Sequence, residues 1–261
     1  VAVGSARADQ YQVGDRFVIQ ADIYYRGQGM AFGYALHGGL EQYAILGPPV
    51  LDGDDGCYLI PVDESIGYSE AALAEPWACV ECAFRVEHRR QLKPGGVTLV
   101  LGAPGCRDGY RLGALANGPA PAAVVAINPP ALLADDLRAA CTAWGLDYVQ
   151  RDAADLPTVV ADVAPEGVHD LILLDPDANT AEVAGTLLAV DGHLCLMVDK
   201  PLQRKVEVDA GRIHYDNTRY IGAAGLDLAE AYSSTRSVKP VPGGKMLIAG
   251  AAGPMGQMHV Q

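Results

Sequence analysis

The sequence predicts an α/β fold, in which a doubly wound parallel sheet follows a smaller β-rich region. Three observations predict it. Short, continuously apolar runs alternate with helical stretches between residues 97 and 198. A glycine turn follows the first of these runs. Residues 1–65 instead contain short extended segments separated by Gly, Pro and Asp turns.

The β-rich region is predicted from extended segments between turn residues. These segments are residues 16–20, 41–46 and 58–61. Residues 24–39 are rich in Gly and Tyr and predict an irregular loop. A helix is expected to begin at Ser69, with Glu70 just after its cap, and a second helical stretch to run from Pro76 toward Arg89.

The sheet is predicted from apolar runs that can be buried on both faces, as in parallel sheets. The expected strands are residues 97–101, 123–127, 148–149, 171–174 and 194–198, with 220–221 as a possible edge strand. The expected helices between them are residues 131–144, 153–164 and 178–189. This alternation is typical of a Rossmann-like doubly wound sheet.

Residues 94–105 and 242–253 share one pattern, Pro-Gly-Gly, then an apolar run, then Gly-x-x-Gly. We therefore predict that residues 245–249 form a strand that begins a second nucleotide-binding unit. The resulting division is a β-rich region over 1–92, a nucleotide-binding unit over 93–236 and the start of a second unit over 237–261. The sequence begins at Val1 rather than Met, which favours a piece of a longer protein.

Glycine turns between a strand and a helix are typical of dinucleotide sites, because they let the backbone approach a pyrophosphate at a helix N-terminus. The second turn keeps all three glycines, spaced G-x-x-G-x-x-G. Its candidate cofactor-binding residues are Gly250, Gly253, Pro254, Met255 and Gly256. A tight turn that binds nothing is the alternative.

The first turn keeps only two glycines at this spacing, and its candidate residues are Gly102, Ala103 and Gly105. Where a carboxylate usually binds the ribose hydroxyls, the next strand ends in Asn128. This unit is therefore expected to bind NADP, to bind weakly, or to be structural only.

Glu75 lies among apolar residues and is paired, caps the turn at Pro76 or ligates a metal. Spacing alone favours the cap. The pair Cys79 and Cys82 has metal-site spacing, but without a second pair we expect buried helical cysteines. No His-Glu-x-x-His, Gly-x-Ser-x-Gly or P-loop sequence occurs.

The chain carries 32 acidic and 19 basic residues, a formal net charge of −13. This balance disfavours nucleic acid and anionic membranes as partners. No apolar run approaches the roughly 20 residues that span a bilayer. The six cysteines are sparse for this length, so we expect a reducing, cytoplasmic setting.

Several segments, in order, resemble the medium-chain, zinc-type alcohol/polyol dehydrogenases. They are Val13-Gly-Asp-Arg-Phe-Val18, Gly38-Gly-Leu-Glu-Gln-Tyr43, Ile60-Pro-Val-Asp63, Ala71-Ala-Leu-Ala-Glu-Pro-Trp-Ala78 and Lys93-Pro-Gly-Gly96. Residues 16–20 with the Tyr/Gly-rich loop resemble the sorbose-1-phosphate reductase-like branch in particular. The family's zinc-binding cysteine, its Gly-His-Glu motif and its four-cysteine lobe do not occur here.

The resemblance implies a partial GroES-like catalytic domain over residues 1–92 and a Rossmann domain that binds NAD or NADP. It implies hydride transfer on a polyol or sugar-phosphate alcohol, and a homo-oligomer paired through sheet edges. It also implies that Glu75 is a catalytic residue and a zinc ligand in the complete protein. A non-catalytic Rossmann-like assembly or regulatory module is the alternative, and an α/β methyltransferase is a weaker one.

Overall fold

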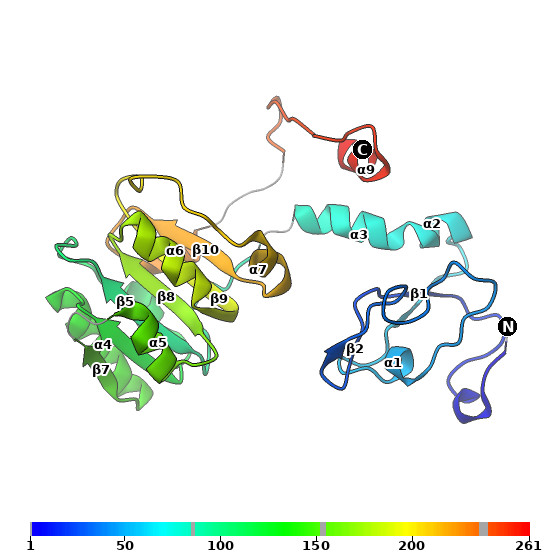
Figure 1. Ribbon diagram of the computed structural model, residues 1–261, viewed down its shortest axis with the longest axis horizontal. Helices are drawn as coiled ribbons and strands as arrows, with labels where there is room; N and C mark the ends of the chain where they lie inside the picture. Colours follow the sequence, from blue (N-terminus) through cyan, green and yellow to red (C-terminus); the bar gives the residue numbers. More distant parts are fainter. Residues whose placement is uncertain (1, 85–86, 152–154, 235–239) are drawn as a thin grey trace. The chain divides into compact units, whose positions relative to one another are not determined.

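The computed structural model describes residues 2–84, 87–151, 155–234 and 240–261. The chain divides into two compact units, each seen in Figure 1. One contains residues 87–236, and the other contains residues 1–86 together with 237–261.

The unit of residues 87–236 is built on a parallel six-stranded sheet. Its strands are β5 (Val97–Gly102), β6 (Ala123–Ile127), β7 (Tyr148–Arg151), β8 (Val168–Leu174), β9 (Leu188–Met197) and β10 (Arg219–Ala223). They lie in the order β10-β9-β8-β5-β6-β7, with every pairing parallel. Counted from β5 this is the doubly wound order 3-2-1-4-5-6, and its topological switch point lies between β5 and β8. The predicted fold class is confirmed.

Helices cover both faces of this sheet. They are α4 (Ala131–Trp144), α5 (Leu156–Val163), α6 (Ala178–Thr186), α7 (Ala210–Tyr215) and α8 (Leu228–Ser233). Side chains of α4 and α8 share one core with Val100, while those of α5 and α6 share the other with Leu99. Figure 1 shows α5 and α6 against the same face. Burial on both sides explains why the strands are continuously apolar.

Local sequence explains where these helices begin and end. Asp155, Asp177, Asp209 and Asp227 cap α5, α6, α7 and α8, each accepting a hydrogen bond from a backbone N–H of the first turn. Gly145 ends α4 in the left-handed conformation, with φ of 73°. The predicted helix over 131–144 coincides with α4, whereas α7 and α8 were not predicted.

No α-helix follows β5 directly. Residues 103–112 form an irregular loop, and the short 3-10 helix η2 (Gly113–Asn117) follows it. Arg107, Asp108 and Gly109 occupy the place of a first helical turn, and Gly109 has a φ of 87° that a right-handed helix cannot use. The helix N-terminus expected at this corner is therefore missing.

The other unit has short, irregular elements. They are η1 (Ser5–Arg7), β1 (Phe17–Ile19), β2 (Tyr24–Tyr25), β3 (Gln28–Gly29), α1 (Pro48–Leu51), β4 (Leu59–Pro61), α2 (Tyr68–Ala72), α3 (Ala74–Ala83) and α9 (Pro254–Val260). β1 pairs with β4 and β2 with β3, both antiparallel. Ile23, Val50 and Tyr58 form its small core.

Two strand predictions in this unit are wrong. Residues 41–46 and 245–249 are described throughout and form no strand. The central apolar side chain of each segment lies in solvent, with Ile45 97% and Leu247 95% exposed. No strand among the described residues pairs with either segment, and a single segment without a partner strand gains no ladder hydrogen bonds or cross-strand packing.

No helix among the described residues is long and apolar enough to cross a membrane.

Candidate functional site

A cavity of about 690 Å³ opens at the switch point of the parallel sheet. Its walls come from the ends of β5 and β8, the first turns of α5 and α6, and Gln203. Ligands of doubly wound folds bind at this crevice, and the volume is within the usual range for ligand sites. Tertiary structure thus brings together residues from 101 to 203 at one edge.

Gly102 is required for the two neighbouring strands to approach each other. A Cβ atom on Gly102 would lie 2.1 Å from the backbone oxygen of Asn128. Asn128 has a φ of 46°, and its Nδ2 donates to the Gly102 oxygen at 3.1 Å. The Asn128 amide therefore holds the ends of β5 and β6 together. Its predicted role toward a ribose stays a prediction.

Ala103 and Gly105 lie at the mouth of this corner. The Ala103 N–H donates to the Leu174 oxygen at 3.1 Å, which ties the turn to β8. Gly105 has a φ of 73°, and a Cβ atom there would meet nothing within 4 Å. The backbone at Gly105 is thus open to a ligand, while Ala103 lines the cavity itself.

Asp175 is the most strongly bound acidic side chain of the site, and sequence reasoning missed it. It follows β8 directly with a φ of 49°. Its carboxylate accepts from the Arg107 backbone N–H at 2.9 Å and from Arg107 Nε at 3.0 and 3.1 Å. Arg107 Nη2 lies 2.9 Å away, and the buried Tyr110 hydroxyl donates at 3.0 Å. The available signal was a carboxylate directly after a buried strand.

These contacts determine the charge of Asp175. Burial raises its pKa, but the hydrogen bonds from Arg107 and Tyr110 outweigh that effect, and the pKa stays below its usual value. Burial, followed by the contact with Asp175, raises the pKa of Tyr110. At neutral pH the site therefore holds an ionised carboxylate, a guanidinium and a neutral phenol.

The cavity wall is acidic. Asp155, Asp175 and Asp177 line it, and its described lining residues include no Lys, Arg or His. Hydrogen bonds from Thr158 lower the pKa of Asp155, and hydrogen bonds from Thr180 lower that of Asp177. The apolar side chains of Leu101, Leu156 and Val183 form other parts of the wall. The cavity thus accommodates a nucleoside, but its charge opposes a diphosphate.

Glu75 lies in the first turn of α3, exposed to solvent. It accepts a hydrogen bond from Cys79 Sγ at 3.1 Å, which raises the pKa of the Cys79 thiol. Cys79 and Cys82 lie on this helix as predicted, but both are exposed, so the prediction that they are buried is wrong. The helix uses Val80 to bury its apolar face instead.

Within the described residues, no three His, Cys, Asp or Glu side chains converge as a metal site. Glu75 with Cys79 offers two ligands at most, whereas zinc takes three or four from protein. The described residues therefore do not fit a zinc ion, and the role of Glu75 as a ligand stays a prediction.

The second glycine turn is followed by a helix, but no strand precedes it within the described residues 240–249. Gly253 caps α9, Pro254 is its first residue and Met255 its second. A Cβ atom on Gly256 would lie 2.2 Å from the Gly250 oxygen, so this glycine allows the tight turn. The predicted cofactor contacts of Gly250, Gly253, Pro254, Met255 and Gly256 stay predictions.

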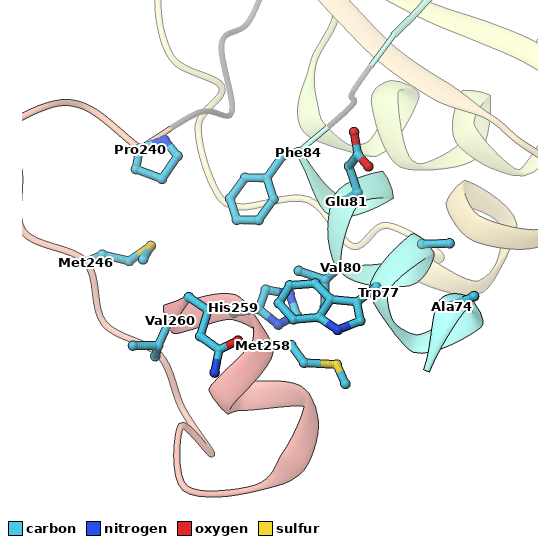
Figure 2. Close-up of a pocket in the computed structure, with 12 residues that line it drawn as sticks. Ala74, Trp77, Val80, Glu81, Phe84, Pro240, Met246, Met258, His259 and Val260 are labelled. Atoms are coloured by element: carbon cyan, nitrogen blue, oxygen red, sulfur yellow. The ribbon is translucent and has the colours of Figure 1, made fainter. Parts of the chain in front are cut away.

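A second cavity, of about 950 Å³, lies beside this turn within the same unit. Figure 2 shows Trp77 and Val80 of α3 beside Met258 of α9, with Phe84, just after α3, on the side of Pro240. Its wall is mostly apolar and brings together no cluster of catalytic side chains.

The chain is similar to two curated enzymes, and no family model matches it. It is 29% identical over 255 residues to mannitol-1-phosphate 5-dehydrogenase of Aliivibrio fischeri, which covers 86% of the chain and 57% of that protein. It is 25% identical over 248 residues to L-sorbose 1-phosphate reductase of Klebsiella pneumoniae, which covers 86% and 58%. The chain thus spans little more than half the length of these relatives.

Solved structures that resemble the chain include 2R,3R-butanediol dehydrogenase from Bacillus subtilis, at 17% identity and a TM-score of 0.34, covering 85% of this chain and 62% of that one. A zinc-binding dehydrogenase from Sinorhizobium meliloti bound to NADP has 20% identity and a TM-score of 0.36, covering 85% and 66%. With TM-scores this low, we draw no conclusion from these two likenesses.

Proposed function

We propose that this chain is part of an NAD(P)-dependent oxidoreductase that transfers hydride to or from a polyol or sugar phosphate. One observation carries the proposal: a glycine corner and a cavity lie together at the switch point of a sheet with strand order 3-2-1-4-5-6. The two relatives named for sugar alcohol or sugar phosphate chemistry support the substrate class.

In this proposal a bound nicotinamide supplies or accepts the hydride, and the chain binds and orients the dinucleotide. Leu101, Leu156 and Val183 exclude water from one side of the cavity. The open backbone at Gly105 lets the cofactor approach the end of β5. Gly102 and Asn128 hold the strand ends that shape the corner.

Zinc enters only through the resemblance of the Glu75 segment to zinc-type dehydrogenases. Because the described residues bring together too few ligands, we derive no step through a metal. Glu75 is proposed as one ligand of a site that other residues would complete. Zinc content measured for the purified chain and for Glu75→Gln tests this, and equal content in both contradicts it.

The second candidate function is a non-catalytic assembly or regulatory module. Two observations favour it: β5 lacks its helix, and the corner already holds Asp175. In either function β10 is a sheet edge at which a homo-oligomer would pair. Chain mass in solution tests that pairing. The six free cysteines are consistent with the proposed cytoplasmic setting.

Titration of the full chain with NADH and NADPH, followed by nicotinamide fluorescence, tests the function. The equivalent positions Ala103 and Ala251 provide matched variants, since each follows the first glycine of its turn. If the first corner binds, Ala103→Glu abolishes binding while Ala251→Glu retains it. The reverse result places the site at the second turn, and no binding to the unmodified chain favours the non-catalytic module.

A further inference from the structure

The donors at the first glycine corner converge on one protein carboxylate. Asp175 receives the Arg107 backbone N–H, the Arg107 guanidinium and the Tyr110 hydroxyl at distances of 2.9 to 3.1 Å. A backbone N–H, a guanidinium and a buried hydroxyl are the groups that bind phosphate oxygens in other proteins.

The loop that replaces the missing helix brings these donors together. Arg107 and Tyr110 both lie in the loop of residues 103–112. Gly105 and Gly109 of this loop have positive φ, and the 3-10 helix η2 follows the loop. Arg107 Nη1 also donates to the Ala224 oxygen at 3.0 Å, and Nη2 donates to the Tyr110 hydroxyl at 2.6 Å. The guanidinium is therefore held at the edge of the sheet from several sides.

Asp175 stands between these donors and the cavity. It is one of the residues that line the cavity, whereas Arg107 and Tyr110 are not. Both side chains are partly exposed, Asp175 by 21% and Arg107 by 28%, but only Asp175 borders the cavity. A dinucleotide in the cavity therefore meets the carboxylate before it meets the guanidinium.

We propose that Arg107 and Tyr110 form an anion site for the diphosphate of a dinucleotide, and that Asp175 occupies it as a built-in competitor. The diphosphate binds only when Asp175 leaves its donors. This inference rests on the proposed function, because it assigns the diphosphate subsite of the same cavity. It also explains how a corner without a helix N-terminus binds an anion: the arginine of the loop replaces the helix.

The other charged residues that line the cavity strengthen the effect of Asp175 on diphosphate binding. With Asp175 in place the Arg107 charge is neutralised, and Asp155 and Asp177 leave the cavity negative. Without the Asp175 charge, Arg107 becomes an unpaired cation beside the cavity. Since like charges that line the cavity oppose binding and a freed guanidinium favours it, removal of the Asp175 charge acts in the same direction through both effects.

Affinity for NADH and NADPH, measured on the full chain and on Asp175→Asn, tests the proposal. Asp136→Asn is the matched control, because Asp136 also accepts two bonds from an arginine, Arg111, and one from a backbone N–H. Its side chain is 21% exposed, like that of Asp175, and it does not line the cavity. Both variants change the net charge equally.

We expect Asp175→Asn to tighten nucleotide binding about tenfold, and Asp136→Asn to stay within about twofold of the unmodified chain. Adding Arg107→Gln to Asp175→Asn should remove the gain. If the unmodified chain binds and Asp175→Asn does not bind more tightly, the competitor is refuted while the proposed function stands. If none of the chains binds, both are refuted.

The unmodified chain itself keeps the test decisive if Asp175→Asn does not fold. Hydrogen exchange at residues 103–112 supplies a second readout. Because the diphosphate should replace Asp175 on the Arg107 N–H, saturating NADH should slow exchange of the Arg107 amide in the unmodified chain, and faster exchange contradicts the proposal. An unchanged rate at saturating NADH contradicts the proposal.

Discussion

Residues 94–105 and 242–253 share one sequence pattern but differ in structure. In the first segment, Leu99 is fully buried in the centre of a parallel sheet. Its equivalent in the second segment, Leu247, is 95% exposed and belongs to no strand. The difference teaches that the pattern specifies a strand only where neighbouring strands are present to pair with it. β5 has β6 and β8 as neighbours, and residues 245–249 have none among the described residues.

Truncation of the two equivalent leucines should give the largest contrast. Leu99→Ala is expected to lower the free energy of unfolding by about 3 to 5 kcal/mol, since it leaves a cavity in a packed core. Leu247→Ala should change it by less than about 0.5 kcal/mol. Urea unfolding followed by tryptophan fluorescence and by circular dichroism measures both effects. Equal losses would mean that residues 245–249 are packed in solution as a strand.

The first glycine of each turn, Gly102 or Gly250, sharpens the comparison further. Gly102→Ala places a Cβ atom 2.1 Å from a backbone oxygen, and we expect a loss of about 2 to 3 kcal/mol. Gly250→Ala meets nothing within 4 Å and is opposed only by its φ of 82°, which costs about 1 kcal/mol. Thermal unfolding of the two variants checks this order. A larger loss at Gly250 would contradict the packing assigned to the two corners.

Acid should destabilise the unit of residues 87–236, which contains the parallel sheet, in particular. Burial and the charges of Arg89, His88 and Arg219 lower the pKa of His193 to about 3, with Asp191 opposing them weakly. The folded pKa lies below the unfolded value near 6.5, so the neutral ring stabilises the fold above pH 6.5 and that contribution is lost as pH falls. The expected slope is up to about 1.4 kcal/mol per pH unit between pH 6.5 and 3.

Urea midpoints at pH 7, 5 and 4 measure this slope. His193→Leu should flatten it, whereas replacement of the half-buried His259 of the other unit should not. A slope that is the same in both variants would show that His193 is already charged in the folded chain.

Thiol reactivity should show the smallest effect. Cys57, Cys79 and Cys82, in the unit that contains residues 1–86, are exposed. Cys141 and Cys195, in the unit of residues 87–236, are buried. A thiol reagent should therefore label the first three in the folded chain and the last two only after unfolding. Because Glu75 raises the pKa of Cys79, Glu75→Gln should speed labelling of Cys79 by a few-fold. Mass spectrometry of the labelled peptides measures each rate, and Cys82 is the internal control.

Sequence patterns predicted the elements of the sheet unit well. The strand at 123–127 and the helix at 131–144 coincide with β6 and α4. The edge strand at 220–221 lies within β10. These elements are buried on one or two faces, so their periodicity reflects their environment directly. The strand predictions at 41–46 and 245–249 were wrong, because no described strand pairs with these similar apolar runs.

The candidate site was predicted only in part. Gly102 and Ala103 line the cavity at the switch point, and Asn128, after β6, donates to the Gly102 oxygen. Asp175 and Arg107 were missed, because they are 68 residues apart and neither belongs to a motif. A sequence pattern does not indicate that a carboxylate after one strand will accept hydrogen bonds from a loop that follows a different strand.

The sequence by itself determined the alternation of strands and helices, the position of the glycine turns and the acidic charge, because these depend on local propensity, burial periodicity and composition. The tertiary structure alone decided which of two similar segments joined the sheet and which carboxylate met Arg107. Both depend on contacts between distant residues, whose free energy exists only once the strands are paired.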